Sequence, residues 1–263
     1  MIEKVIHYCW FGGNTKNEMV LKCMESWKKY CPDYKVVEWN EDNFDVNMCR
    51  FTKEAYESKK WAFVSDVARL HILYNYGGVY LDTDIELKEN IDEWLQYDGW
   101  FAFQYDNTIA TGLGCASIKK NKIVKLLLDD YKNRRFLDDN GNIIMQVCSD
   151  INTELFRDKL PQLTLNNENQ VIENTLFMNT ASYNLKARNH GGLSWTDHPK
   201  TKIEEEKRYH DTKLKRFLRN YKIQYFIKDH FDEKIFKLYA FISYDMLDDG
   251  LLYHIKRQIK KFI

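Results

Sequence analysis

The segment from Lys4 to Trp39 constrains the fold more than any other part of the sequence. Lys4–Trp10 is predicted to form a short strand that ends at Gly12-Gly13. Glu18–Tyr30 is predicted to form a helix, because its apolar residues recur at spacings of four, and Tyr34–Trp39 alternates like a second strand. A strand, a glycine turn, a helix and a second strand in this order are typical of a parallel α/β unit that binds nucleotides.

A second segment places acidic residues at the end of a strand. A long helix is predicted from Lys53 to Asn75, and Gly77-Gly78 ends it, as glycine often does at a helix C-terminus. Val79–Leu81 then forms a very short apolar strand that leads directly into Asp82-Thr83-Asp84. Carboxylates at the C-terminal end of a strand lie where α/β sheets bind their ligands.

The remaining segments continue the alternation of strands and helices. We expect strands at Trp100–Tyr105, within Ile109–Ile118, at Val171–Glu173 and at Leu176–Met178, and helices at Asn121–Arg134 and Gln146–Leu160. From about Lys200 onwards the chain is rich in Lys and Tyr and is predicted to be helical. The sequence therefore predicts an α/β domain over residues 1–199 and a basic helical extension over residues 200–263.

The charge is balanced over the whole chain but not along it. There are 39 Lys and Arg residues against 39 Asp and Glu, yet residues 200–263 hold 16 basic and 10 acidic residues, and the body before them has the opposite excess. An acidic body is a poor binder of nucleic acid, because neutralising phosphates needs a basic surface.

In the tail, four apolar residues follow helical spacing beside four basic ones: Leu252, Ile255, Ile259 and Phe262 beside Lys256, Arg257, Lys260 and Lys261. Such a helix either makes a peripheral contact with an anionic membrane or packs on the body, and the sequence leaves both open.

The sequence carries no signal for export or for a membrane span. No apolar run approaches the roughly 18–20 residues that a span needs, and the N-terminal apolar stretch is broken by His7 and Cys9, unlike a signal peptide. The six cysteines are dispersed without a C-x-x-C pair, so neither a zinc cluster nor a dense disulfide framework is expected. We expect a cytoplasmic protein.

Two pairs of charged residues are candidates for chemistry. Asp82 and Asp84 can converge on one cation, and their hard oxygen ligands suit Mg²⁺ or Mn²⁺; a solvated turn is the alternative. Asp66 and Arg69 lie three residues apart and would share one helix face. They form either an intrahelical ion pair or a site for sugar hydroxyls and a phosphate.

Several short motifs resemble, in order, those of one enzyme family. They are Ile6–Gly13 (IHYCWFGG), Ser26-Trp27 with Tyr34–Asn40, Ala62–Arg69 (AFVSDVAR), Tyr76–Asp84 (YGGVYLDTD) and His190–Trp195 (HGGLSW). The joint pattern runs across about residues 4–195 and resembles the D-x-D glycosyltransferases of family 32. That family includes bacterial capsule-type sugar transferases and yeast-type mannosyltransferases, with the large clostridial toxin glucosyltransferases as distant relatives. The tail beyond Lys200 lies outside the resemblance.

The resemblance implies a GT-A fold, a nucleotide-sugar donor, a divalent cation and retention of the anomeric configuration. It also implies roles for residues of the N-terminal motifs. Trp10 would lie against the nucleobase, although a place in the core is the alternative for this side chain. Tyr80 would contact the ribose or the edge of the base, and Asp66 and Arg69 would hold the donor sugar and its phosphate side.

The resemblance assigns further roles to the aspartates and to the last motif. Asp84 would ligate the metal, and Asp82 would touch the ribose, the sugar or a metal-bound water, which also makes Asp82 a candidate ligand. Ser194 and Trp195 would close over the diphosphate. Members of the family often carry two histidines before the Ser-Trp pair, and this chain departs from that pattern with Asn189-His190. His190 is therefore either a metal ligand or an ordinary loop histidine.

Together these features predict a metal-dependent, retaining glycosyltransferase that acts on a saccharide or lipid-linked saccharide acceptor in bacterial capsule, exopolysaccharide or lipopolysaccharide synthesis. No Ser-His-Asp or Cys-His pattern is evident, so we expect the leaving diphosphate itself to accept the acceptor's proton on the same face. The alternatives are a nucleotide-sugar hydrolase, a non-catalytic nucleotide-sugar-binding module, and a toxin-like transferase that modifies a protein. A UDP-sugar is the expected donor by resemblance, and we expect the region Gln104–Ser117 to select its sugar.

Overall fold

The structure, a computed structural model, describes residues 1–104, 107–144 and 146–191. The expected domain boundary after residue 199, the helical extension over 200–263, and the predicted site residues Ser194 and Trp195 all lie outside the described residues. None of the helices within the described ranges is long and apolar enough to cross a membrane.

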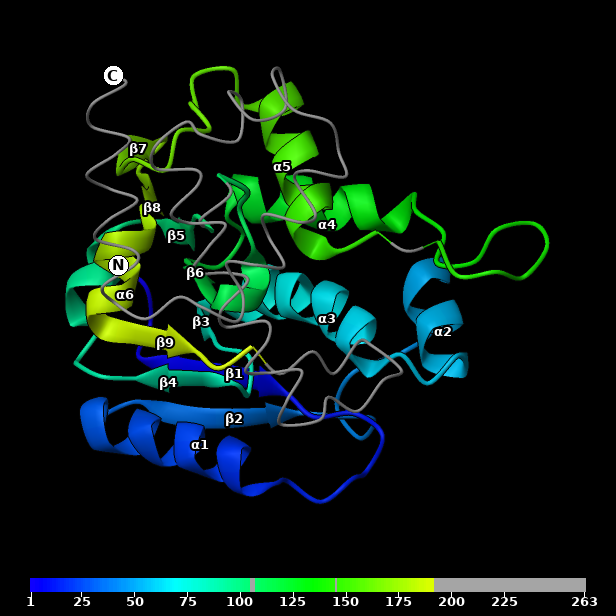
Figure 1. The fold of residues 1–263 in the computed structure, drawn as a ribbon, viewed down its shortest axis with the longest axis horizontal. Helices are drawn as coiled ribbons and strands as arrows, with labels where there is room; N and C mark the ends of the chain where they lie inside the picture. Colours follow the sequence, from blue (N-terminus) through cyan, green and yellow to red (C-terminus); the bar gives the residue numbers. More distant parts are fainter. Residues whose placement is uncertain (105–106, 145, 192–263) are drawn as a thin grey trace, which may run out of the picture. The chain divides into compact units, whose positions relative to one another are not determined.

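Within these residues, seven strands form one mixed sheet (Figure 1). Their order is β2 (Lys35–Trp39), β1 (Val5–Cys9), β3 (Gly78–Tyr80), β6 (Cys115–Ser117), β5 (Gly99–Ala102), β8 (Thr175–Met178) and β7 (Gln170–Ile172). β6 and β7 run antiparallel to their neighbours, whereas the other strands share one direction. This mostly parallel sheet, flanked by helices, confirms the expected α/β fold of the GT-A type.

Helices pack on both faces of the sheet. On β1, Ile6 and Tyr8 lie in the core that contains Trp27 of α1 (Glu18–Tyr30). Cys9 and Phe11 point to the opposite face, where the core includes residues of α3 (Trp61–Tyr76), α4 (Lys122–Lys132) and α5 (Cys148–Lys159). This alternation is the period of two expected of a strand that is buried on both faces.

The predicted long helix from Lys53 to Asn75 is wrong, because the structure has two helices there. α2 (Arg50–Glu57) and α3 are separated at Lys59, whose φ of 57° is left-handed. The Lys60 amide donates to the Ala55 carbonyl at 2.9 Å and the Lys59 amide to the Tyr56 carbonyl at 2.9 Å. These two bonds form the cap that usually contains glycine. A lysine occupies the left-handed position here, so no glycine marks the break in the sequence.

A glycine turn connects α3 to β3. Gly78 has a φ of 93°, and a Cβ atom there would lie 2.9 Å from the Val5 carbonyl oxygen. His7 reinforces the turn from the neighbouring strand: its Nδ1 accepts from the Trp39 indole at 3.0 Å, so its Nε2 donates to the Gly77 carbonyl at 3.1 Å. The end of α3 is thereby fixed against β1 at the entrance to the aspartate segment.

Several elements were not anticipated from the sequence. β4 (Ile85–Leu87) and β9 (Ala187–Asn189) pair in a separate two-stranded sheet. Three short helices complete the described part of the chain: η1 (Asp92–Gln96), η2 (Thr111–Leu113) and α6 (Thr180–Lys186). The sequence predicted no strand at β9, because a strand of three residues has no periodicity to detect.

Candidate functional site

Asp82 and Asp84 lie in a turn directly after β3. The Ile85 amide donates to the Asp82 carbonyl at 3.0 Å, which places Thr83 and Asp84 in the middle of the turn. The Leu81 amide donates to the His7 carbonyl at 3.0 Å and extends the pairing of β1 with β3. Both carboxylates are therefore carried at the C-terminal edge of the parallel strands, as the sequence predicted.

Arg69 links this turn to helix α3. Its Nη2 donates to both oxygens of Asp82, at 2.9 and 3.1 Å, and its Nη1 forms an ion pair with Asp66 at 2.9 Å. The Arg69 side chain is only 2% exposed, and that of Asp66 is 10% exposed. The expected ion pair between Asp66 and Arg69 is present, and its extension to Asp82 joins the helix to the aspartate turn.

Tyr80 lies directly beneath the guanidinium. The central carbon of Arg69 is 5.1 Å from the centroid of the Tyr80 ring, which is the arrangement of a cation–π contact. Tyr80 is 1% exposed. Its ring thus packs against the guanidinium inside the protein, away from solvent.

Burial controls the charges of this cluster. Burial raises the pKa of Asp66 to about 6, although the neighbouring Arg69 charge opposes the shift. Burial also raises the pKa of Asp82, against the same opposing charge. Burial disfavours the charge of Arg69 itself, but Asp82 and Asp66 together raise its pKa well above the ordinary value. One buried cation therefore compensates two carboxylates, the buried Asp66 and the partly exposed Asp82.

Three residues that sequence analysis did not identify complete the surroundings of Arg69. Its Nη1 donates to the Thr111 hydroxyl at 3.1 Å and lies 3.8 Å from the Cys148 sulfur. The Asn152 amide donates to the same Thr111 hydroxyl at 3.2 Å. Burial, and then the Asp66 charge, raises the pKa of the Cys148 thiol to about 12, so this sulfur is a neutral thiol. Thr111 falls in the region expected to select the sugar, whereas Cys148 and Asn152 carried no sequence signal.

Gly112 lets the backbone of η2 approach the charged cluster. A Cβ atom at this position would lie 3.1 Å from Asp82 Oδ2 and 3.7 Å from Arg69 Nη1. The first distance is shorter than an ordinary van der Waals contact, so any larger residue would displace the carboxylate or the η2 backbone.

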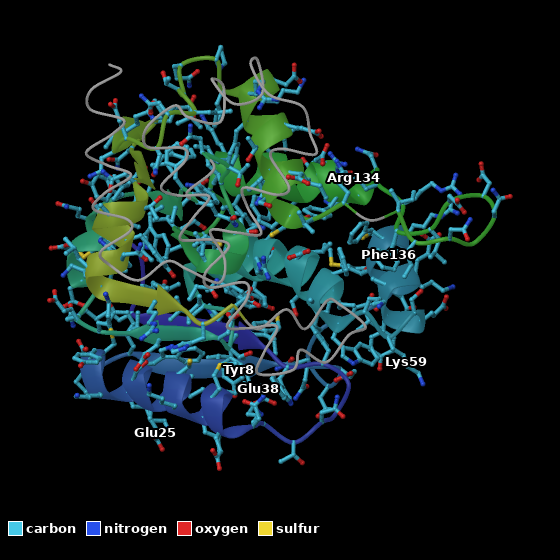
Figure 2. The ribbon with its side chains drawn as sticks, in the orientation of Figure 1. Tyr8, Glu25, Glu38, Lys59, Arg134 and Phe136 are labelled. Carbon is cyan, nitrogen blue, oxygen red and sulfur yellow. The ribbon has the colours of Figure 1, made fainter. Side chains whose placement is uncertain are left out.

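Trp10 follows β1 at the same edge of the sheet. Its indole donates to the Asn14 carbonyl at 2.7 Å, and the Lys16 ammonium lies 5.2 Å from the ring centroid. Lys16 in turn pairs with Glu38 at 2.8 Å, and Glu38 accepts from the Tyr8 hydroxyl. Figure 2 shows Tyr8 and Glu38 close together at the ends of β1 and β2. Trp10 is half-buried, and its own loop holds the indole in place. It lies near the edge of the sheet, but none of its described hydrogen bonds reaches Asp66, Arg69 or Asp82.

His190 approaches the aspartate turn through the small sheet. Its backbone amide donates to the Asp84 carbonyl at 3.0 Å, next to the pairing of β9 with β4. Its imidazole Nε2 donates to Glu86 at 2.7 Å. Within the described residues, no three His, Cys, Asp or Glu side chains lie close enough together to hold a metal ion among them. A metal-binding role for His190 stays a prediction.

Comparison with known proteins gives sequence relatives of one kind. Residues 17–100, which include both aspartates and the Asp66–Arg69 pair, match the family model described as a glycosyltransferase sugar-binding region containing DXD motif. A glycosyltransferase of Acanthamoeba polyphaga mimivirus, described as uncharacterized, is 30% identical over 177 residues that cover 64% of this chain and 68% of the viral protein. Inositol phosphoceramide mannosyltransferase 3 of Schizosaccharomyces pombe is 32% identical over 103 residues. That match covers 38% of this chain and 29% of the yeast protein.

Solved structures show weaker likenesses. One described as PaToxG glycosyltransferase has a TM-score of 0.48 and 18% identity and covers 62% of this chain and 71% of its own. A glycosyltransferase involved in the glycosylation of the major capsid of PBCV-1 has a TM-score of 0.37 and 10% identity, covering 67% and 82%. The fold assignment therefore rests on the strand order and strand directions of the sheet.

Proposed function

Because the chain belongs to the glycosyltransferases with a DXD sugar-binding region, we propose that it is a metal-dependent, retaining enzyme that transfers a sugar from a nucleotide-sugar donor. The arrangement of Asp82 carries this proposal. Its carboxylate lies at the C-terminal edge of β3 and accepts both Nη2 hydrogen bonds of Arg69. The Arg69 guanidinium fixes the orientation of the Asp82 carboxylate from one side. A carboxylate preorganised in this way at a sheet edge is suited to hold a ligand on its other side.

The donor set at this edge fits a hard divalent cation. Asp82 and Asp84 offer carboxylate oxygens, the ligands that Mg²⁺ and Mn²⁺ prefer, and a site with few protein ligands leaves room for the oxygens of a diphosphate. We assign metal ligation to Asp84 and, directly or through water, to Asp82; His190 is a further candidate. When bound, the cation would stabilise the charge that develops on the departing diphosphate.

The chain's own residues would then position the donor. Arg69 would keep Asp82 oriented toward the cation and the donor, and Asp66 would stabilise the charge of Arg69 and face the donor sugar. Tyr80 is covered by Arg69, so we assign it a supporting role instead of the ribose contact expected from the resemblance. Trp10 would lie against the base, and Ser194 and Trp195, outside the described residues, would close over the diphosphate.

Retention of configuration follows from the proposed same-face displacement, in which the acceptor hydroxyl attacks the anomeric carbon and the leaving diphosphate takes its proton. This route needs no protein nucleophile at the anomeric carbon. The thiol closest to Arg69 in the described site, Cys148, is neutral at ordinary pH because its pKa is raised to about 12. Anomer analysis of the product by NMR would test the proposal; an inverted product would contradict it.

For the substrates, we propose a UDP-sugar donor and a saccharide or lipid-linked saccharide acceptor in the assembly of a bacterial surface polysaccharide. The likeness to the inositol phosphoceramide mannosyltransferases supports mannose as a second candidate sugar and an inositol-phosphate lipid as a second kind of acceptor. Thermal-shift screening against UDP-, GDP- and CMP-sugars with Mn²⁺ would identify the nucleotide, because at equal concentration the ligand that binds the folded protein most tightly stabilises it most.

A variant pair tests the transferase proposal directly. We expect Asp84→Ala to lower sugar transfer by about 100-fold or more, the size of effect seen when a charge-stabilising group is lost from an active site. Asp158→Ala is the matched control, since Asp158 pairs only with its exposed neighbour Lys159 among the described contacts. Products are followed by mass spectrometry with the identified donor and Mn²⁺. Release of sugar only into water would identify a hydrolase, and undiminished transfer by Asp84→Ala would refute the assigned metal site.

A further inference from the structure

Arg69 has a third hydrogen-bond partner besides the two aspartates. Its Nη1 donates to the Thr111 hydroxyl at 3.1 Å while it pairs with Asp66 at 2.9 Å. Thr111 is 1% exposed, so water does not compete for this bond. A guanidinium is planar, with its N–H groups in a fixed fork, so fixing Nη1 also fixes the direction in which Nη2 points. In this structure Nη2 points at both oxygens of Asp82.

Asn152 of α5 determines where the Thr111 hydroxyl lies. Its Nδ2 is 3.2 Å from that hydroxyl and 3.4 Å from the Ile109 carbonyl oxygen, so one amide holds both ends of the segment that leads into η2. Asn152 is fully buried, and its Oδ1 has no hydrogen-bond partner among the described residues. A buried oxygen without a partner costs stability, and the two hydrogen bonds made by Nδ2 of the same side chain offset that cost.

We propose that Thr111 is a positioning residue for Arg69, and that Asn152 orients Thr111 for this task. This inference rests on the proposed function and extends it, since it assigns η2 and α5 the role of directing Arg69 toward Asp82. Without the Thr111 oxygen, Nη1 keeps only Asp66 and the more distant Cys148 sulfur as acceptors, so the guanidinium rotates more freely between the aspartates. Asp82 then loses its fixed orientation toward the cation.

Thr111→Val tests the proposal, because valine keeps the shape of threonine and lacks the acceptor oxygen. We expect Mn²⁺, measured by electron paramagnetic resonance in the presence of UDP, to bind about tenfold more weakly, the lower end of the effect of losing a group that orients a metal ligand. Thr111→Ser restores the oxygen and should restore the affinity to near the wild-type value.

Thr153→Val is a matched control on the same helix. The Thr153 hydroxyl accepts from the Ile109 amide at 2.9 Å and donates to the Ser149 carbonyl at 2.6 Å, so its loss removes buried bonds, one of them to the same segment, without touching Arg69. Both valine variants should lower Tm by a few degrees. Only Thr111→Val should weaken Mn²⁺ binding; equal weakening in both variants, or no rescue by serine, would overturn the proposal.

A second measurement tests the role of Thr111 independently of the proposed function. Nitrogen-15 NMR should detect the restrained guanidinium of Arg69 in the wild-type protein and in Thr111→Ser, and faster rotation in Thr111→Val. This comparison decides the role of Thr111 even if the wild-type protein binds no Mn²⁺ or transfers no sugar, in which case the proposed function alone would fail. An unchanged guanidinium signal in Thr111→Val would overturn the positioning role.

Discussion

Arg69 is a buried cation that joins two carboxylates, the buried Asp66 and the partly exposed Asp82. The two ion pairs are both 2.9 Å long, and the Tyr80 ring packs against the guanidinium that they share. Removing one member of a buried charge group leaves its partners uncompensated, which is more costly than never having buried them. At the scale of single residues, stability and the proposed chemistry therefore depend on the same side chain.

We expect Arg69→Met to reduce the free energy of unfolding by about 3 kcal/mol, the cost of breaking a buried charge pair. Arg135→Met is the control, because Arg135 pairs with the largely exposed Asp139 and such surface pairs contribute about 0–1 kcal/mol. Urea denaturation at pH 7 measures both values. Equal losses in the two variants would show that the Arg69 cluster contributes no more than a surface ion pair.

His7 should make stability dependent on pH in the mildly acidic range. Burial lowers its pKa from 6.5 to about 4, so the unfolded chain binds a proton at a higher pH than the folded protein does. The stabilisation is complete above pH 6.5 and is lost as the pH falls from 6.5 to 4, by about 3 kcal/mol in total. Urea denaturation at pH 7 and pH 4.5 should show a smaller pH-dependent loss for His7→Gln than for the wild-type protein.

At the scale of elements, the segment from α3 through β3 to the aspartate turn was the most predictable part. Its glycines, its short apolar strand and its carboxylates are local signals, and the structure places them in the expected order. The break between α2 and α3 was not predictable, since Lys59 adopts a left-handed conformation that usually signals glycine. The pairing of β4 with β9 could not be predicted from the sequence either, because it joins segments about a hundred residues apart.

Gly78 should be sensitive to substitution. Gly78→Ala adds a Cβ atom 2.9 Å from the Val5 carbonyl at a φ of 93°, so it combines backbone strain with a clash. Gly141→Ala is the matched control: its φ is 82°, but nothing lies within 4 Å of the added Cβ. We expect Gly141→Ala to cost about 1–2 kcal/mol and Gly78→Ala clearly more, measured by thermal unfolding. Equal losses would mean that the backbone around Val5 relaxes without cost.

At the scale of the whole molecule, the charge asymmetry between the body and the basic tail leads to a prediction from sequence alone, because residues 200–263 lie outside the described residues. We expect the full chain to sediment with vesicles that contain anionic lipid, since basic amphipathic helices bind such surfaces. Removal of residues 251–263 should abolish this binding. Replacing all four basic residues of this segment with glutamine should abolish it too: Lys256, Arg257, Lys260 and Lys261. Neutral vesicles are the control, and equal sedimentation of the full and shortened chains would exclude a membrane role for this segment.

The sequence by itself determined the α/β class and the place of the aspartates after β3, and it put Asp66 and Arg69 on one helix face, where an ion pair was one of two alternatives. These features depend on periodicity, on glycine and on spacings of a few residues, which are local properties of the chain. Only the tertiary structure decided that Arg69 also binds Asp82, that the Tyr80 ring packs against it, that Thr111 and Cys148 contact it, and that Asn152 bonds to Thr111. Those contacts join separate helices and strands, and a polar residue that is buried by packing has no local pattern that distinguishes it from one exposed to water.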